Sequence, residues 1–412
     1  MKKNFLSIIC SKSLAAKFLF IIVFFAAVLV GKGQSSANYV FTTNATSSLA
    51  LDKDGGAIDM STGTTTLVAA GLDATASTVT SIGFDLYFMG SRFSQFSTND
   101  DGVLQLGSSV IATNTYTITG GNISNPRLSA FGADLRTGLT TGKVHYKLVG
   151  TAPNRILVVE YLNMQVFYTG TSVTGTATYQ MRFYESNGVI EYVYGAVNAS
   201  SITSTNRAPS IGFYTASATN SFASVAYATN ANSVTSPYAA NPLVAATGDI
   251  ANLNSAADGS RRMYRWTPNI PANPSAALTF GTITISSIQM SWTDNASNEV
   301  GYVIYNGSTF VAIVAANSTS YTATGLTPNT AYTFNVYPYT EGALSAAPAT
   351  GTTSTIACPS YSGTMTIGPT GTFSNLTTAI SNLTTCGYTG NIILELETTY
   401  TSTGETYPLT FN

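Results

Sequence analysis

The chain has 412 residues, enough for two or three domains, and its formal net charge is −2. Apolar residues make up 44% of the sequence and charged residues 9%, against about 25% charged residues in ordinary soluble proteins. The many aromatic residues exclude a disordered chain, the lack of a basic stripe argues against a nucleic-acid partner, and the single histidine, His145, argues against a conventional enzyme.

Residues 1–34 carry the pattern of a secretory signal peptide. Four lysines within the first 17 residues precede an unbroken apolar run over 18–30, and this order is typical of a cleaved signal. An uncleaved membrane anchor is the alternative, but a spanning helix needs about 20 apolar residues. Cleavage would remove five lysines and no acid, which changes the net charge from −2 to −7. We therefore expect a secreted or outer-surface protein with no membrane span after cleavage.

Residues 38–266 have the pattern of a large antiparallel β-sandwich. The clearest hairpin lies within 179–194, where Asn187 and Gly188 supply the positive φ angles that a tight turn requires. Residues 82–88 alternate apolar and polar side chains, as a half-buried strand does. Further strands are expected at 103–106, 144–149 and 156–162.

Several segments of this block carry a family resemblance. They are IGFDLYFMG (82–90), NDDGVLQLG (99–107), LSAFGADL (128–135), APNRILVVEY (152–161) and YQMRFYESNGVIEYVYG (179–195). In their order and sequence they resemble an N-terminal domain that is common in exported surface proteins of the Bacteroidetes group. That domain is loosely similar to the nidogen-type extracellular sandwich. The resemblance implies an extracellular interaction module or a carbohydrate-adjacent one, and no known reaction.

Residues 267–274 are expected to form a semi-rigid linker. Pro268, Pro271 and Pro274 fix φ and remove backbone donors, which disfavours a helix or a central strand.

Residues 275–355 carry the pattern of a second, smaller sandwich. Ile288, Met290 and Trp292 alternate along one strand, and the segment then continues into an L-x-P-x-T-x-Y pattern. The block resembles a fibronectin type III domain, which implies a buried Trp292 and a tyrosine corner, with the ring of Tyr332 buried and its hydroxyl bonded to nearby backbone. The signature positions are Trp292, Leu326, Pro328, Thr330 and Tyr332.

Residues 356–412 combine a short helix with a strand. Apolar residues at 376, 379, 380 and 383 predict an amphipathic helix over 374–383, capped by Ser374, and 391–396 reads as a strand. This order resembles the entry of a right-handed parallel β-helix of the pectate-lyase-like class, with the helix capping its open end. Because a solenoid needs about three repeats, we expect this block to hold only the cap and first rung of an incomplete domain.

The cysteines fit the same compartment. Cys10 lies in the predicted signal, and Cys358 and Cys386 remain as an even pair, which predicts a disulfide in an exported chain. The closed loop would contribute roughly 3 kcal/mol. A metal site at these cysteines has no support, because there is no neighbouring His and no C-x-x-C pattern.

No catalytic, cofactor or metal site is expected in this chain. His145 as a general base would need a partner that the sequence does not locate, so we interpret it as an outward-facing strand residue. The acidic loop 52–59 departs from the calcium-loop template at Gly56, Ala57 and Gly63. Calcium is also weighed at 100–102, but an Asp-Asp-Gly sequence is more simply a turn.

Two charged patterns have alternative interpretations. Glu395 and Glu397 could be paired acids in a cleft, but solvated strand-edge acids are preferred. The basic cluster over 261–265 is expected to lie across aromatic surface, with contact to a polyanion as the alternative.

These patterns together predict an all-β chain. It would comprise a large antiparallel sandwich, a fibronectin type III sandwich and a truncated β-helix entry with one capping helix. The function predicted is a non-catalytic binding or adhesion protein whose partner is an extracellular protein or a glycan. The alternatives are the accessory domains of a carbohydrate-active enzyme with a β-helix catalytic domain, and a purely structural coat repeat.

Overall fold

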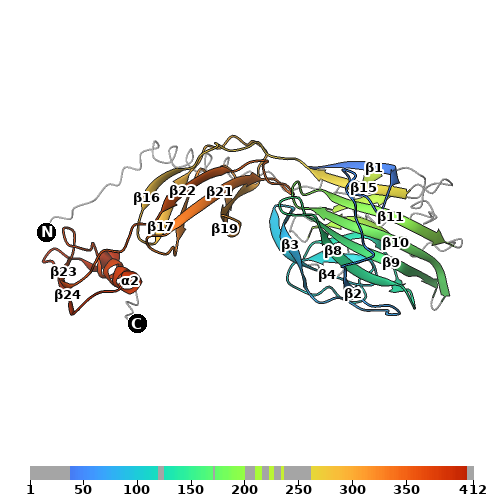
Figure 1. Ribbon diagram of the computed structural model, residues 1–412, viewed down its shortest axis with the longest axis horizontal. Coiled ribbons are helices and arrows are strands. Elements are labelled where there is room, and N and C mark those ends of the chain that lie inside the picture. Colours follow the sequence, from blue (N-terminus) through green and yellow to red (C-terminus); the bar gives the residue numbers. More distant parts are fainter. Residues whose placement is uncertain are drawn as a thin grey trace, which may run out of the picture. The chain divides into compact units, whose positions relative to one another are not determined.

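The computed structural model describes residues 38–118, 125–169, 172–199, 209–215, 222–226, 233–235 and 261–405 (Figure 1). Strands dominate this part of the chain, which confirms the expected all-β class. The predicted signal peptide, 1–34, lies outside the described residues. No helix in the described part is long and apolar enough to cross a membrane. The chain divides into two compact units, 1–271 with 298–300 and 339–344, and the remainder.

The first unit contains two antiparallel sheets. The larger sheet consists, in spatial order, of β1 (Tyr39–Ser47), β15 (Arg261–Pro268), β11 (Ile190–Ala199), β10 (Ser172–Tyr184), β9 (Ile156–Thr169), β8 (Lys143–Val149) and β2 (Thr65–Val68), with β7 (Leu135–Thr137) paired to β9. The smaller sheet consists of β14 (Ser233–Thr235), β13 (Phe222–Ala226), β12 (Ser210–Tyr214), β6 (Arg127–Gly132), β5 (Val103–Leu106), β4 (Ser91–Thr98) and β3 (Thr80–Phe88).

An aromatic core fills the space between these sheets. Tyr161 and Tyr179 stack with ring centroids 4.7 Å apart, and Tyr192 meets Trp266 edge-on at 4.7 Å. Buried tyrosines need a partner for the hydroxyl. The Tyr179 hydroxyl donates to the carbonyl of Phe131 at 3.2 Å, so these rings both fill the core and bind backbone of the opposite sheet.

The end of β15 differs from the expected linker. Thr267 and Pro268 pair with Val40 and Tyr39 of β1, so the strand extends two residues into the predicted 267–274 segment. The proline is tolerated because β11 pairs with β15 only as far as Trp266, so no strand requires a hydrogen bond from the other side of Pro268.

The second unit begins with a smaller sandwich. One sheet orders β16 (Thr279–Ile283), β17 (Ser287–Ser291) and β20 (Ser320–Thr324), and the other β19 (Thr309–Ala315), β18 (Gly301–Asn306), β21 (Ala331–Tyr339) and β22 (Ala349–Ser354). Ile288, Met290 and Trp292 are buried between them. Tyr332 forms the expected corner contact, since its hydroxyl accepts from Thr327 N–H at 2.8 Å, but its ring is only half-buried.

The last segment pairs two parallel strands across a helix. β23 (Gly363–Ile367) and β24 (Ile392–Leu396) are connected through α2 (Leu376–Cys386), and a 3₁₀ turn follows at Ser402–Gly404. A disulfide joins Cys358 to Cys386 with Cα atoms 5.3 Å apart. Two details correct the expectation: Asn375 rather than Ser374 caps α2, because its side chain accepts from Thr378 N–H, and Cys386 is the last residue of the helix rather than a residue beyond it.

Candidate functional site

A row of polar side chains crosses the outer face of the larger sheet in the first unit. Antiparallel register places Glu160 opposite both His145 and Gln180 on its two neighbouring strands. Two residues along β10 from Gln180, Arg182 lies opposite Glu191, which in turn lies opposite Arg265. Because side chains alternate between the faces of a strand, their neighbours Tyr161, Tyr179 and Tyr192 enter the core instead. We call this row the polar ladder: His145, Glu160, Gln180, Arg182, Glu191 and Arg265.

Hydrogen bonds connect the ladder from one strand to the next. Glu160 accepts from Gln180 Nε2 at 2.7 Å, and its other oxygen lies 2.7 Å from His145 Nε2. Gln180 in turn accepts from Arg182 Nε at 2.9 Å. Glu191 accepts from Arg265 Nε at 2.6 Å, and Arg182 lies 3.7 Å from its other oxygen. The buried Glu191 carboxylate is therefore paired with two arginines, which offsets the cost of removing these charges from water.

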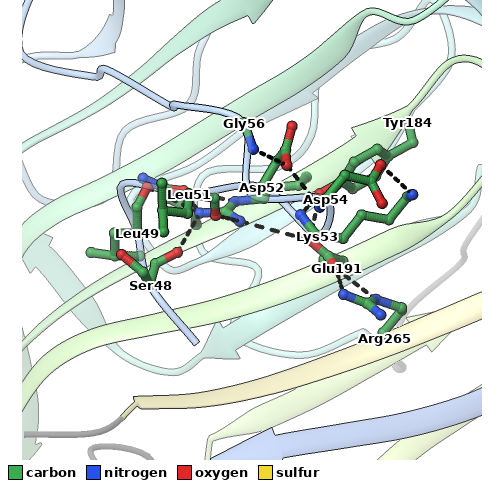
Figure 2. Close-up of polar contacts among 12 residues, drawn as sticks. Ser48, Leu49, Leu51, Asp52, Lys53, Asp54, Gly56, Tyr184, Glu191 and Arg265 are labelled. Carbon is green, nitrogen blue, oxygen red and sulfur yellow. Dashed lines mark hydrogen bonds and ion pairs between the residues drawn. The ribbon is translucent and has the colours of Figure 1, made fainter. Parts of the chain in front are cut away.

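Residues 48–62 form a loop that we call the strap. Its part from Ser48 to Gly56 lies over the region of the sheet that carries Tyr184, Glu191 and Arg265 (Figure 2). Arg182 donates to three of its carbonyl oxygens, those of Leu51 at 2.7 Å, Ser48 at 2.9 Å and Leu49 at 3.0 Å. Strap backbone also reaches the sheet where Lys53 N–H donates to the Tyr184 hydroxyl at 3.2 Å. One buried guanidinium therefore fixes the strap to the sheet.

Hydrogen bonds inside the strap and apolar packing against the sheet also hold the strap in place. Asp52 Oδ1 accepts from the N–H groups of Asp54 at 2.8 Å and Gly56 at 2.7 Å, which closes a tight turn. Ile58 and Met60 are buried in a small apolar cluster with side chains of β9 and β10. Apolar packing and polar contacts thus hold the same segment in one conformation.

Burial shapes the electrostatics beneath the strap. Burial lowers the pKa of the Arg182 guanidinium, and raises the pKa of the Tyr184 hydroxyl, which donates to Glu191 Oε2 at 2.6 Å. A raised tyrosine pKa keeps this hydroxyl protonated and able to donate. The Tyr184 hydroxyl therefore bridges the strap backbone and the ladder.

The structure corrects the interpretation of His145. Its side chain lies on the outer face of the sheet as expected, but it is 1% exposed and is bound to Glu160, which is 8% exposed. A general base must reach a proton on a substrate. Both partners are enclosed, so this geometry suits a structural pair in the ladder rather than proton transfer to a bound molecule.

The acids of the strap are occupied by turn contacts. Asp59 accepts from Ser61 N–H at 2.8 Å and from the hydroxyl of Thr62 at 2.7 Å, and the hydrogen bonds from Ser61 and Thr62 hold the pKa of this carboxyl well below its usual range. With Asp52 closing its own turn, this loop has no free set of carboxylates of the kind that the calcium template requires.

The remaining singled-out residues lie elsewhere. Arg265 binds Glu191 instead of lying only across aromatic surface, and the side chains of 261–262 lie outside the described ones. Glu395 is exposed on β24, whereas Glu397 follows the strand and accepts from the Thr370 hydroxyl at 2.7 Å. The structure therefore does not join these two acids in one cleft.

Sequence reasoning missed Glu160, Arg182 and Glu191. Each stands alone among apolar and aromatic neighbours in a strand, which signals a polar outer face. Their burial could not be inferred from the local sequence, because the strap carbonyls that bind Arg182 lie more than 130 residues earlier in the chain.

Comparison with known families and proteins follows this division of the chain. Residues 38–268 match the family model described as NIDO related, and 272–352 match that of the fibronectin type III domain. A stretch of 74 residues is 43% identical to exoglucanase A of Cellulomonas fimi, covering 17% of this chain and only 8% of that relative's length. Among solved structures, FN3tt is 22% identical (TM-score 0.19), covering 21% of this chain and 96% of that one. A fibronectin type III domain of human collagen XX is 24% identical (TM-score 0.18), covering 21% and 90%.

Proposed function

The chain belongs to the NIDO-related family, and from this premise we propose that it is an exported surface protein whose first sandwich is a binding module. Its partner would be an extracellular protein or a glycan. The fibronectin type III domain would act as a spacer between this module and the C-terminal segment.

The locked strap is the observation that carries this proposal. A loop already held in one conformation loses little conformational entropy on binding, and recognition residues commonly lie on loops that a rigid scaffold positions. Leu51 is 47% exposed on the strap, and the Asp54 side chain is 72% exposed. An exposed apolar side chain and an exposed charged side chain are therefore carried by the same fixed backbone.

Export is supported by the covalent chemistry of the chain. A disulfide such as Cys358–Cys386 persists in oxidising compartments and is rare in the cytosol. The lysines and apolar run of residues 1–34 predict the matching signal peptide. Mass spectrometry of the exported protein should find its N-terminus between about residues 30 and 37, and an intact Met1 would contradict cleavage.

The C-terminal segment supports a β-helix entry as part of this proposal. β23 and β24 pair in parallel across α2, and a hollow of about 560 Å³ lies beside the helix and β24. Ile380, Leu383 and Leu394 contribute to its lining. In a β-helix, neighbouring rungs and the cap would cover apolar side chains such as these.

The alternative function is that of accessory domains in a carbohydrate-active enzyme. The stretch shared with exoglucanase A favours it, because that relative is named as an enzyme of glucan chemistry. In this alternative the β-helix would carry the catalytic groups.

Binding and hydrolysis can be separated in one experiment. The full chain is labelled, applied to a glycan array and to intact cells, and the medium is analysed for released sugars. The binding module predicts retention without release, and Leu51→Ala/Asp54→Ala should weaken retention at least about tenfold. Ile313→Ala, which truncates a 40% exposed apolar side chain on β19, is the control and should bind normally. Sugar release would favour the enzyme alternative, and no retention on either surface would contradict the binding module.

A further inference from the structure

The turn between β4 and β5 buries two consecutive carboxylates. Asp100 is 0% exposed and Asp101 is 1% exposed. Gly102 follows with φ +82°, and a side chain there would place its Cβ 2.0 Å from the carbonyl oxygen of Phe131. The backbone at Gly102 is therefore packed tightly against β6.

Each carboxylate has one occupied oxygen and one open oxygen. Asp100 Oδ1 accepts from Thr75 N–H at 3.0 Å, and Asp101 Oδ1 accepts from Leu135 N–H at 3.1 Å. The Oδ2 atoms of both residues are buried, and neither has a hydrogen-bond partner among the described residues. Buried polar groups in native proteins are normally paired, so open oxygens on two consecutive buried residues call for a ligand.

The surroundings supply no positive charge. Among the described residues, no lysine or arginine forms an ion pair with Asp100 or Asp101. The carboxylate of Asp73 instead adds further negative charge to both. An exogenous cation would satisfy the open oxygens and balance the negative charge of the ionised carboxylates.

We propose that the Asp100–Asp101 turn binds a calcium ion through the two open Oδ2 atoms, with main-chain carbonyl oxygens and water completing its shell. Hard oxygen ligands and a flexible ligand number are what Ca²⁺ accepts, whereas Zn²⁺ favours His and Cys. No group of three or more His, Cys, Asp or Glu side chains within the described ranges could hold a metal. Only two charged ligands are then available, which predicts the weak affinity of extracellular calcium modules, with a dissociation constant of about 10⁻⁴–10⁻³ M.

The ion would connect the two sheets of the first sandwich. The turn belongs to the smaller sheet, whereas Leu135, whose N–H binds Asp101, begins β7 of the larger sheet. Thr75 contributes a third segment through two hydrogen bonds with Asp100. Calcium is therefore expected to stabilise this end of the sandwich, whether or not the strap is the binding surface.

Thermal unfolding of the full chain, stripped with EDTA and titrated with CaCl₂, tests the proposal. At a calcium concentration ten times the dissociation constant, the unfolding equilibrium constant should fall about tenfold, and Mg²⁺ should be less effective. Asp100→Asn/Asp101→Asn retains the Oδ1 acceptors and should abolish this response. Asp52→Asn/Asp59→Asn, in the strap, is the matched control and should keep it.

A second measurement needs no variant. Tb³⁺ replaces Ca²⁺ in oxygen sites, and the Tyr179 hydroxyl lies beside Gly102, where it would be 2.6 Å from an added Cβ. Excitation of the tyrosines should therefore sensitise Tb³⁺ luminescence, and excess Ca²⁺ should quench it. Absence of both the calcium-dependent stabilisation and the luminescence up to about 10 mM metal, ten times the upper limit expected for such sites, would overturn the proposal, as would a full response in the Asp100/Asp101 variant.

Discussion

At the scale of single residues, Arg182 has the widest role in the first sandwich. It is buried, it binds Gln180 on its own strand, and it donates to three carbonyls of the strap. Burying a guanidinium costs free energy unless its donors are paired. Because the strap supplies most of the acceptors for Arg182, the folded sheet and the strap conformation depend on each other.

Arg182→Ala should lower the free energy of unfolding by about 3–5 kcal/mol, because it leaves strap carbonyls and Gln180 without their donor. Urea unfolding followed by tyrosine fluorescence measures this loss. The control is Arg155→Ala, which removes a two-point pair with Glu185 and a hydrogen bond to the Gly83 carbonyl from a side chain that is 25% exposed, and should cost less, about 1–2 kcal/mol. Equal losses in the two variants would show that Arg182 is not the anchor.

The buried acids of the β4–β5 turn predict an unusual pH dependence. Burial raises the pKa of Asp100 to about 7 and that of Asp101 to about 8 from an ordinary value of 3.8. Between pH 3.8 and the raised pKa values, the folded state binds more protons than the unfolded state. The free energy of unfolding therefore falls as pH rises through this range. Calcium-free protein should therefore lose stability steadily between pH 4 and pH 8.

Urea midpoints in EDTA at pH 5, 6, 7 and 8 measure this slope. Asp100→Asn/Asp101→Asn should flatten it, because the amides do not titrate. A midpoint of the wild-type protein that rises over this range would contradict the raised pKa values of the pair.

At the scale of elements, local patterns predicted strands but not the contacts between distant ones. The alternation over 82–88 became β3, and the apolar spacing over 376–383 became the buried side of α2. The Asn187-Gly188 turn was predictable for the same reason, since its geometry depends on adjacent residues. The ladder was not, because the burial of His145 and Arg182 depends on neighbours far away in the chain.

The disulfide is an element-scale constraint on α2. It binds the last residue of the helix to Cys358, which precedes β23. Reduction should raise hydrogen exchange over 358–405 and leave 275–350 unchanged, because separate cores open separately. Exchange mass spectrometry with and without reductant measures this. Two free thiols in the unreduced protein, or an equal rise in both regions, would contradict the prediction.

At the scale of the whole molecule, the chain joins a NIDO-related domain to a fibronectin type III domain. The signature Leu326–Tyr332 made the second domain predictable, because its tyrosine corner is a local contact between Thr327 and Tyr332. The loose pattern of the first block indicated its class, but its distinguishing feature, a strap locked across a polar ladder, depends on residues from five strands. This feature underlies the proposed binding function.

Hydrogen exchange of the full chain, alone and with the glycan or cell-surface protein that retains it, tests this claim most directly. The strap amides over 48–62 should already exchange slowly in the free protein, and binding should slow them further while 279–354 stays unchanged. Fast exchange of the free strap, or protection by the partner that falls on 279–405 instead, would contradict the account.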